Sequence, residues 1–155
     1  TSIFTQLSGK HNIYNNLAVI AALNEADLTV DCKKEFFAEF TGMGRRFQKI
    51  CEISGINVYD DYAHHPTEIQ ATLDAATNYP HKRIILVFQP HTYTRTQAFL
   101  KEFAEVLSQV DILVLAEIYA AREKNTIGIS SKDLLALVKE KGTESYYFPS
   151  FEEIE

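Results

Sequence analysis

The stretch Arg83-Ile84-Ile85-Leu86-Val87-Phe88 decides how this chain folds. An uninterrupted apolar run of this length, rich in β-branched side chains, is typical of a strand buried on both faces. The sequence Ile-Leu-Val-Leu-Ala within residues 111–116 has the same character. Between the two runs, residues 99–110 repeat apolar side chains at helical spacing. A strand, a helix and a strand in this order predict a parallel sheet covered by helices.

Similar elements lie on either side of this unit. Residues 47–61 predict two strands joined by a turn at Ser54-Gly55. Pro66 suits the first position of a helix, whose apolar stripe is formed by Ile69, Leu73 and Ala76. Residues 146–148 predict a last short strand, and residues 151–155 the start of another helix.

Two helix starts carry capping signatures. Thr94 with Gln97, and Ser130 with Asp133, each place a hydroxyl three positions before a side chain that can bond back to the backbone. We therefore expect one helix to open at Thr94 and another, which carries Leu134, Leu137 and Val138, to open at Ser130.

The first 40 residues follow a different pattern. Apolar spacing predicts an amphipathic helix over residues 11–24 with Asn12 as its N-cap, and a second helical stretch covers residues 33–40. The glycines at 42 and 44 then break the pattern, so we place a domain boundary there. The predicted fold is an α/β, Rossmann-like, mostly parallel sheet with helices on both faces over residues 41–155, preceded by a short helical segment, residues 1–40.

Composition excludes several classes of protein. The chain has 155 residues, of which 46% are hydrophobic and 23% charged, as in a globular domain rather than a disordered one. Its net charge of -6 argues against nucleic-acid binding, and its apolar runs fall short of the roughly 20 residues that span a bilayer. The beginning is not a signal peptide, and two cysteines without metal-ligand spacing favour a reducing, cytoplasmic setting. Both ends look cut, so we expect a fragment of a longer protein.

The polar residues of interest follow the expected strands. Ligands of open parallel sheets bind beyond the carboxyl ends of the strands. The segments in that position are residues 60–68, 89–96 and 117–123, and they contain three of the five histidines together with Arg95. The sequence therefore predicts a functional site along one rim of the sheet.

Most of these residues also have a structural interpretation. The pair His64-His65 suits a site, but it equally suits a helix start at which His65 satisfies a backbone donor. Asp60 and Asp61 could act as partners of a helix dipole. Arg95 fits a structural role poorly, because a positive charge is unfavourable near the start of a helix.

A metal site is the other chemical possibility at this rim. Asp61, His64, His65 and His91 are ligand types that Zn or Mn uses. However, adjacent pairs point in diverging directions, and the sequence has neither an H-E-x-x-H motif nor paired cysteines. We expect no intrinsic metal site.

In four motifs, which occur in the expected order and cover nearly the whole chain, the sequence resembles the Mur ligases. The motifs are Gly9-Lys10-His11-Asn12 with Asn15, Arg45-Arg46-Phe47-Gln48, the nine-residue block Asp60 to Glu68, and Phe88-Gln89-Pro90-His91 with Tyr93 and Arg95-Thr96. The last two blocks resemble the branch of the family that joins L-alanine to UDP-N-acetylmuramate.

The resemblance implies a three-domain cytoplasmic enzyme. ATP with Mg²⁺ would activate the carboxylate of UDP-N-acetylmuramate as an acyl phosphate, which the amine of alanine attacks. Residues 1–40 would be the tail of the central domain and residues 41–155 most of the closing carboxy-terminal domain. The phosphate-binding loop and the UDP-sugar domain are absent from this sequence, so the chain would need its own amino-terminal and central domains. Alone it would be inactive and hold no cofactor tightly.

The resemblance also implies roles for particular residues. The nucleotide would be bound by His11, Asn15, Arg46 and Asp61, and the amino acid by Tyr62, His64, His91 and Arg95. Of these, Arg46, His64 and Arg95 would take part in catalysis. The fork of the Arg95 guanidinium suits the alanine carboxylate. Some relatives carry a second arginine where this chain has Thr92, which leaves more of that work to Arg95.

Other functions remain open at the level of sequence. Within the family, the branch that reattaches recycled murein tripeptide is the nearest alternative, although it is expected to depart from the pattern of residues 91–95. A metal-dependent hydrolase would use the histidines differently. A dinucleotide-dependent oxidoreductase lacks its glycine motif here, and an interaction domain would need none of these residues.

Overall fold

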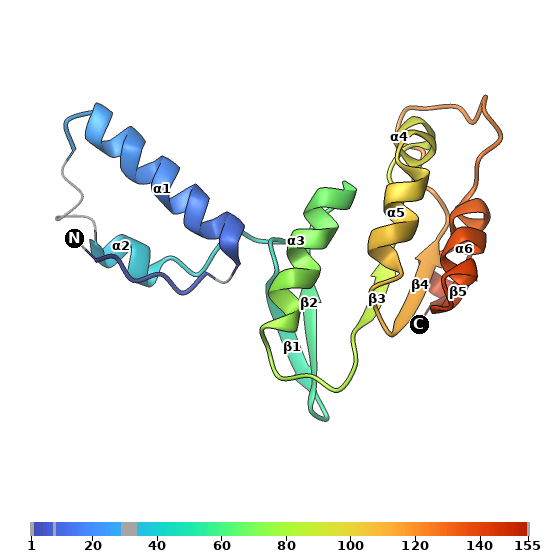
Figure 1. Cartoon of the computed structure of the whole chain (residues 1–155), viewed down its shortest axis with the longest axis horizontal. Helices are drawn as coiled ribbons and strands as arrows, with labels where there is room; N and C mark the ends of the chain where they lie inside the picture. The colour runs from blue at the N-terminus through green and yellow to red at the C-terminus, as the bar shows by residue number, and fades with distance from the viewer. Residues whose placement is uncertain (1, 8, 29–33, 155) are drawn as a thin grey trace. The chain divides into compact units, whose positions relative to one another are not determined.

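A computed structural model describes residues 2–7, 9–28 and 34–154 (Figure 1). The chain forms two compact units. The first contains residues 1–62 together with residues 71–75, and the second contains residues 63–70 together with residues 76–155.

Two helices open the first unit. Helix α1, Lys10–Glu25, is the predicted amphipathic helix, and α2 is Lys34–Glu39. The N-cap of α1 is Gly9, whose φ of 97° favours glycine, so the prediction of Asn12 as the cap was wrong. The predicted start of the second helix at residue 33 lies outside the described residues.

The predicted hairpin is confirmed. Strands β1, Gln48–Ile53, and β2, Ile56–Asp60, pair antiparallel. Ser54 and Gly55 have φ angles of 52° and 82°, as a two-residue hairpin turn requires. Helix α3, Pro66–Thr77, follows and begins at Pro66, as predicted from the residue that suits a first helical position.

The second unit is built on a parallel sheet. Its strands are β3, Ile85–Phe88, β4, Ile112–Ala116, and β5, Glu144–Phe148, in the order β3-β4-β5. Helices α4, Tyr93–Ala98, and α5, Leu100–Leu107, connect β3 to β4, and α6, Ser131–Glu140, connects β4 to β5. A 3₁₀ turn, η2, Phe151–Glu153, comes last. The predicted α/β class is confirmed.

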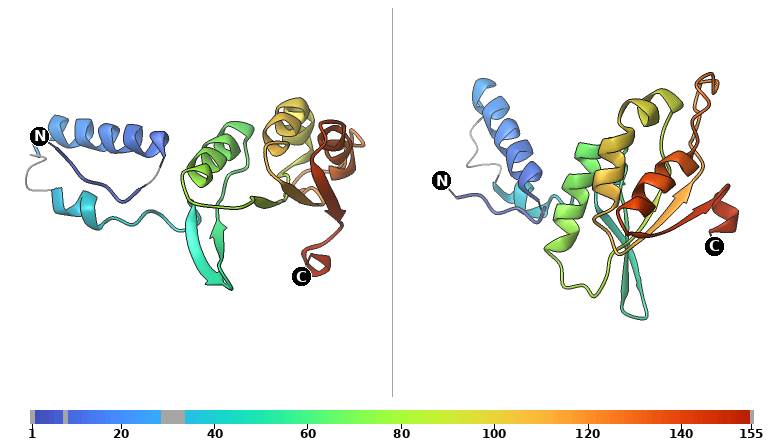
Figure 2. Two further views of the ribbon diagram at one scale, coloured as in Figure 1. Left: turned by 60° about the horizontal axis from the view of Figure 1, so that its bottom comes forward. Right: turned by 45° about the vertical axis from the view of Figure 1, so that its right-hand side comes forward.

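The core of this unit lies between one face of the sheet and helices α5 and α6, which pack side by side (Figures 1 and 2). Leu113 and Leu115 of β4 are fully buried there. The helices contribute the fully buried side chains Phe103, Leu107, Leu134 and Val138. Crossovers of one hand that step through the sheet in a single direction bring their helices to the same face.

The other face of the sheet differs from the expectation. Ile85 and Val87 of β3 are each 48% exposed among the described residues, so the prediction that this strand is buried on both faces was wrong. The strand stands at an edge of its three-stranded sheet, and α5 and α6 cover only the face that carries Phe88. An apolar run marks a strand but does not report its position in the sheet.

The two predicted capping signatures had opposite outcomes. At α6, Ser130 donates its backbone N–H to Oδ2 of Asp133 at 2.8 Å, so this capping box is confirmed. At the earlier helix, the N-cap is Thr92 and the helix breaks at Phe99, so the predicted start at Thr94 was wrong. Thr94 lies inside α4 instead, where its backbone N–H and its hydroxyl both donate to Glu123.

Candidate functional site

The loops after β3 and β4 are joined beyond the ends of the strands. Tyr119 donates its N–H to the carbonyl of Pro90 at 2.8 Å, and Thr92 donates its N–H to the carbonyl of Tyr119 at 2.8 Å. These bonds continue the parallel pairing as a bridge between His91 and Tyr119. The two rings lie 5.5 Å apart. The predicted rim therefore has a fixed backbone at the point where His91 emerges.

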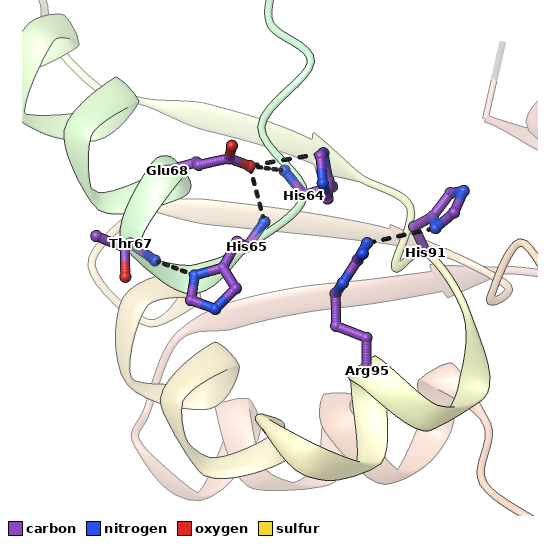
Figure 3. A network of polar contacts seen from close by, with 6 residues as sticks. All are labelled: His64, His65, Thr67, Glu68, His91 and Arg95. Carbon is purple, nitrogen blue, oxygen red and sulfur yellow. Dashed lines mark hydrogen bonds and ion pairs between the residues drawn. The ribbon is translucent and has the colours of Figure 1, made fainter.

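Three of the predicted site residues come together in the second unit. Nη1 of Arg95 lies 3.4 Å from Nδ1 of His91, and the rings of His64 and His91 are 6.1 Å apart (Figure 3). All three side chains are half-buried. Because an arginine only donates, Nδ1 of His91 would be the acceptor in this contact. The cluster thus places one guanidinium beside two imidazole rings.

Glu68 orders the first of these loops. Its Oε2 accepts the backbone N–H groups of His64 and His65 at 3.0 and 3.2 Å, ahead of the first turn of α3 (Figure 3). The same oxygen lies 3.5 Å from Nδ1 of His64, so a protonated His64 would form an ion pair with it. Glu68 therefore fixes both the backbone and the charge environment of His64.

The two adjacent histidines have different surroundings. Nδ1 of His65 accepts the backbone N–H of Thr67 at 3.3 Å, and its ring packs edge-on against Phe99 at 4.6 Å. The structural interpretation of His65 is therefore confirmed. The ring of His64 turns toward His91 instead (Figure 3).

In the first unit, the predicted nucleotide residues lie at the ends of the hairpin. Oδ2 of Asp61 accepts the N–H of Phe47 at 2.7 Å, so this carboxylate joins the residue before β1 to the residue after β2. The guanidinium of Arg45 lies 4.8 Å from the Tyr62 ring, and its Nε is 3.1 Å from Oδ2 of Asp60. Arg46, the next residue along, is exposed.

The remaining predicted residues, His11 and Asn15, lie one turn apart on α1, and both are exposed. Asn15 donates from Nδ2 to Oδ1 of Asn12 at 3.4 Å. The ring of His11 folds back over Gly9, where an added Cβ would stand 2.7 Å from its Cε1. The absence of a side chain at Gly9 therefore allows this position of the imidazole.

Two glutamates of the rim were missed by the sequence reasoning. Oε1 of Glu117 accepts the N–H groups of Ile118 and Ser131, at 2.7 and 3.0 Å, and its Oε2 accepts the hydroxyl of Tyr147 at 2.8 Å. Burial opposes its ionisation, but these hydrogen bonds outweigh burial and hold the pKa of Glu117 below its ordinary value. Glu117 thus ties the end of β4 to α6 and β5.

The second missed residue is Glu123, which holds Thr94. Its Oε2 accepts the N–H of Thr94 at 3.0 Å and its Oε1 accepts the Thr94 hydroxyl at 2.5 Å. These bonds, with a smaller contribution from the charge of Arg95, lower the pKa of Glu123. No local signal identifies a partner 29 positions along the chain.

Within residues 2–7, 9–28 and 34–154, no three His, Cys, Asp or Glu side chains gather as a metal ion would require. No helix in the described part of the chain is long and apolar enough to cross a membrane.

Comparison with known proteins shows which family this chain resembles. The domain described as "Mur ligase, glutamate ligase domain" matches residues 45–155. UDP-N-acetylmuramate–L-alanine ligases of Agathobacter rectalis and Caldanaerobacter subterraneus are 57% and 50% identical over 95% and 96% of the chain. The chain spans about a third of the length of these relatives, 32% in both cases.

Solved structures agree with this assignment. The UDP-N-acetylmuramate–alanine ligase of Thermotoga maritima superposes with a TM-score of 0.80 at 30% identity, over 98% of this chain and 32% of that one. A murein peptide ligase of Psychrobacter arcticus, at 24% identity, shares the fold with a TM-score of 0.71, over 98% of this chain and 32% of that one. With its carboxy-terminal 111 residues matched by this domain, the chain belongs to the Mur ligase family.

Proposed function

We propose that this chain is part of an ATP-dependent ligase that joins L-alanine to UDP-N-acetylmuramate in peptidoglycan synthesis. The observation that carries the proposal is the cluster of His64, His91 and Arg95, in a chain whose relatives bear the name of that ligase. A guanidinium beside two imidazole rings suits the carboxylate and amine of an amino acid. ATP and UDP-sugars are substrates of the cytoplasm, which is where we place the reaction.

The division of labour between domains follows from what this sequence contains. We assign residues 1–40 to the tail of the central ATP-binding domain and residues 41–155 to the domain that closes over it. The 155 residues include no phosphate-binding loop. The amino-terminal and central domains of the whole ligase would supply that loop and the site for the UDP-sugar.

The proposed reaction has two steps. The γ-phosphoryl group of ATP passes to the carboxylate oxygen of UDP-N-acetylmuramate, and ADP leaves. The alanine amine then attacks the carbonyl carbon, a C–N bond forms, and inorganic phosphate departs as the C–O bond to it breaks. The amine gives up a proton in this second step. Positioning and charge stabilisation account for most of the catalysis in such transfers.

The residues of this chain take distinct parts. Arg46 is assigned to the nucleotide phosphates, where a guanidinium stabilises developing charge. Arg95 is assigned to the alanine carboxylate, which its fork suits, and Tyr62 and His91 are assigned to the same amino acid. His64, with Glu68 next to its Nδ1, is the group that accepts the proton of the amine. His11 and Asn15 are assigned to adenine, and Asp61 to the ribose.

Mg²⁺ bound with ATP would neutralise phosphate charge during the transfer. The described residues of this chain do not gather three metal ligands, so they do not form a site that would hold the ion by themselves. Protein sites for Mg²⁺ typically use one or two carboxylates together with substrate phosphates.

The proposal is tested with the full-length protein that contains this chain. It is incubated with ATP, UDP-N-acetylmuramate and, in parallel, alanine, glycine, serine or the tripeptide of recycled murein. We expect ADP release that depends on alanine, together with a product heavier than the UDP-sugar by one alanine residue. Turnover with the tripeptide but not with alanine would move the chain to another branch of the family.

A further inference from the structure

We propose that Glu123 is a positioning residue, which sets the place of Arg95 and through it the binding of the alanine carboxylate. The proposal rests on the proposed function of Arg95. Glu123 belongs to none of the motifs that carry the family resemblance. As a positioning residue, it would not itself contact the substrate. It acts from the loop between β4 and α6 on the helix that carries Arg95.

The contact is a two-pronged clamp on one residue. Both carboxylate oxygens of Glu123 accept hydrogens from Thr94, one from the backbone N–H at 3.0 Å and one from the hydroxyl at 2.5 Å. Thr94 immediately precedes Arg95. A charged acceptor that holds two donors of the same residue restrains both the position and the rotation of that turn.

Helix α4 needs such a clamp because its own cap is poor. The helix has only six residues, and its N-cap, Thr92, has a φ of 69° and makes no side-chain cap hydrogen bond. The first N–H groups of a helix have no partner within it. A carboxylate from another loop therefore supplies the acceptor that the N-cap residue does not. Arg95 is the third residue of this helix and shares any movement of its first turn.

Glu123 holds the backbone without occupying the guanidinium. No ion pair within 4 Å joins Glu123 and Arg95 in the described part of the chain, and the Arg95 side chain extends toward His91 instead (Figure 3). The hydrogen bonds from Thr94, and to a smaller degree the charge of Arg95, lower the pKa of Glu123, so the carboxylate is ionised at neutral pH. Glu123 therefore does not compete with a substrate carboxylate for the fork of Arg95.

The loop that carries Glu123 is itself anchored. At its start, Glu117 accepts hydrogen bonds from Ser131 and Tyr147, and Tyr119 pairs with the backbone of residues 90–92. Near the clamp, Glu123 donates its N–H to the carbonyl of Ala120 at 2.9 Å, and Ala121 has a left-handed φ of 51°. A carboxylate on a fixed loop can determine the place of a short helix.

The test uses the full-length ligase that contains this chain. We expect Glu123→Ala to lower kcat/KM for alanine about 10-fold while changing KM for ATP less than about 2-fold. Glu123→Gln keeps one acceptor oxygen but loses the charge, so it should lower kcat/KM for alanine roughly 3-fold. Thr94→Val removes only the hydroxyl and should give a comparable partial loss. Glu102→Gln, an exposed carboxylate of α5, is the matched control and should change neither constant.

A double-mutant cycle with Arg95→Ala separates positioning from general destabilisation. If Glu123 acts through Arg95, adding Glu123→Ala to Arg95→Ala should change kcat/KM for alanine by less than about 2-fold. The proposal would be overturned if Glu123→Ala lowered kcat/KM for alanine as much in the Arg95→Ala background as in the wild type. It would also be overturned if Glu123→Ala alone left kcat/KM for alanine unchanged. If Glu123→Ala fails to fold, Glu123→Gln and Thr94→Val are carried through the same cycle. If Arg95→Ala itself spares alanine, the proposed role of Arg95 fails, and that of Glu123 fails with it.

Discussion

At the residue scale, adjacent residues of the same type make different contacts, which the sequence alone does not distinguish. His65 closes the first turn of α3 through Thr67, whereas His64 faces His91. In the same way, both Arg45 and Arg46 are exposed, but the guanidinium of Arg45 lies over the Tyr62 ring and pairs with Asp60. The motifs point to segments of the chain, but they do not distinguish the two members of an adjacent pair. Ring direction depends on the backbone at each position, which sequence spacing does not specify.

We expect the amino-acid side of the proposed site to depend most on Arg95. In the full-length protein, Arg95→Ala would remove the proposed bidentate contact with the alanine carboxylate. A charge-assisted contact of this kind is worth about 2–4 kcal/mol, so kcat/KM for alanine should fall roughly 30- to 1000-fold. KM for ATP should change far less. Arg95→Lys should rescue only part of the loss, because an ammonium lacks the planar fork. Steady-state kinetics with each substrate varied in turn provides the check, and a variant that spares alanine but raises KM for ATP would place Arg95 on the nucleotide side.

Glu117 makes stability depend on pH. Its pKa is lowered from 4.5, so the folded chain favours the ionised form more than the unfolded chain does. The stability that it contributes is therefore complete above pH 4.5 and is lost as the pH falls through the folded-state pKa. Thermal unfolding of Glu117→Gln should show a lower Tm than the parent chain at pH 7 and a smaller difference at pH 3. Glu140→Gln, an exposed carboxylate of α6, is the control; an equal difference at both pH values would contradict this role of Glu117.

At the scale of elements, local signals were reliable where the partner is local. The hairpin turn, the start of α3 at Pro66 and the capping box of Ser130 and Asp133 are all fixed by residues within a few positions of one another. The start of α4 was missed because its capping carboxylate, Glu123, comes from another loop. The exposure of β3 was missed because it depends on where the strand stands in the sheet.

The hairpin turn offers a stability test at this scale. Ser54 adopts a left-handed φ of 52°, which asparagine tolerates better, so Ser54→Asn should stabilise the chain by a few tenths of a kcal/mol, up to about 1. Gly55 has a φ of 82° with open space around a potential Cβ, so Gly55→Ala should cost about 1 kcal/mol through backbone strain alone. Urea unfolding of both variants measures this. Equal midpoints for the two would show that the turn does not restrain the hairpin.

At the scale of the whole molecule, the chain covers about a third of the length of its relatives, 32% for the ligase of Agathobacter rectalis. Its 155 residues include no phosphate-binding loop. We therefore expect the isolated chain to bind ATP weakly, with a Kd well above roughly 1 μM, because a site that is divided between domains loses much of its binding energy. It should show no alanine-dependent ATP hydrolysis. Calorimetry and a phosphate-release assay on the purified chain measure both, and micromolar or tighter binding would contradict the division of the site.

The most direct measurement of the central claim is a domain exchange. The corresponding third of the Agathobacter rectalis ligase, 57% identical to this chain, is replaced by residues 1–155, and product formation from ATP, UDP-N-acetylmuramate and alanine is followed. We expect ATP-dependent joining of alanine, which is lost when the exchanged chain carries Arg95→Ala and retained when it carries Glu102→Gln. A folded hybrid that binds ATP but joins no alanine, or whose activity survives Arg95→Ala, would contradict it.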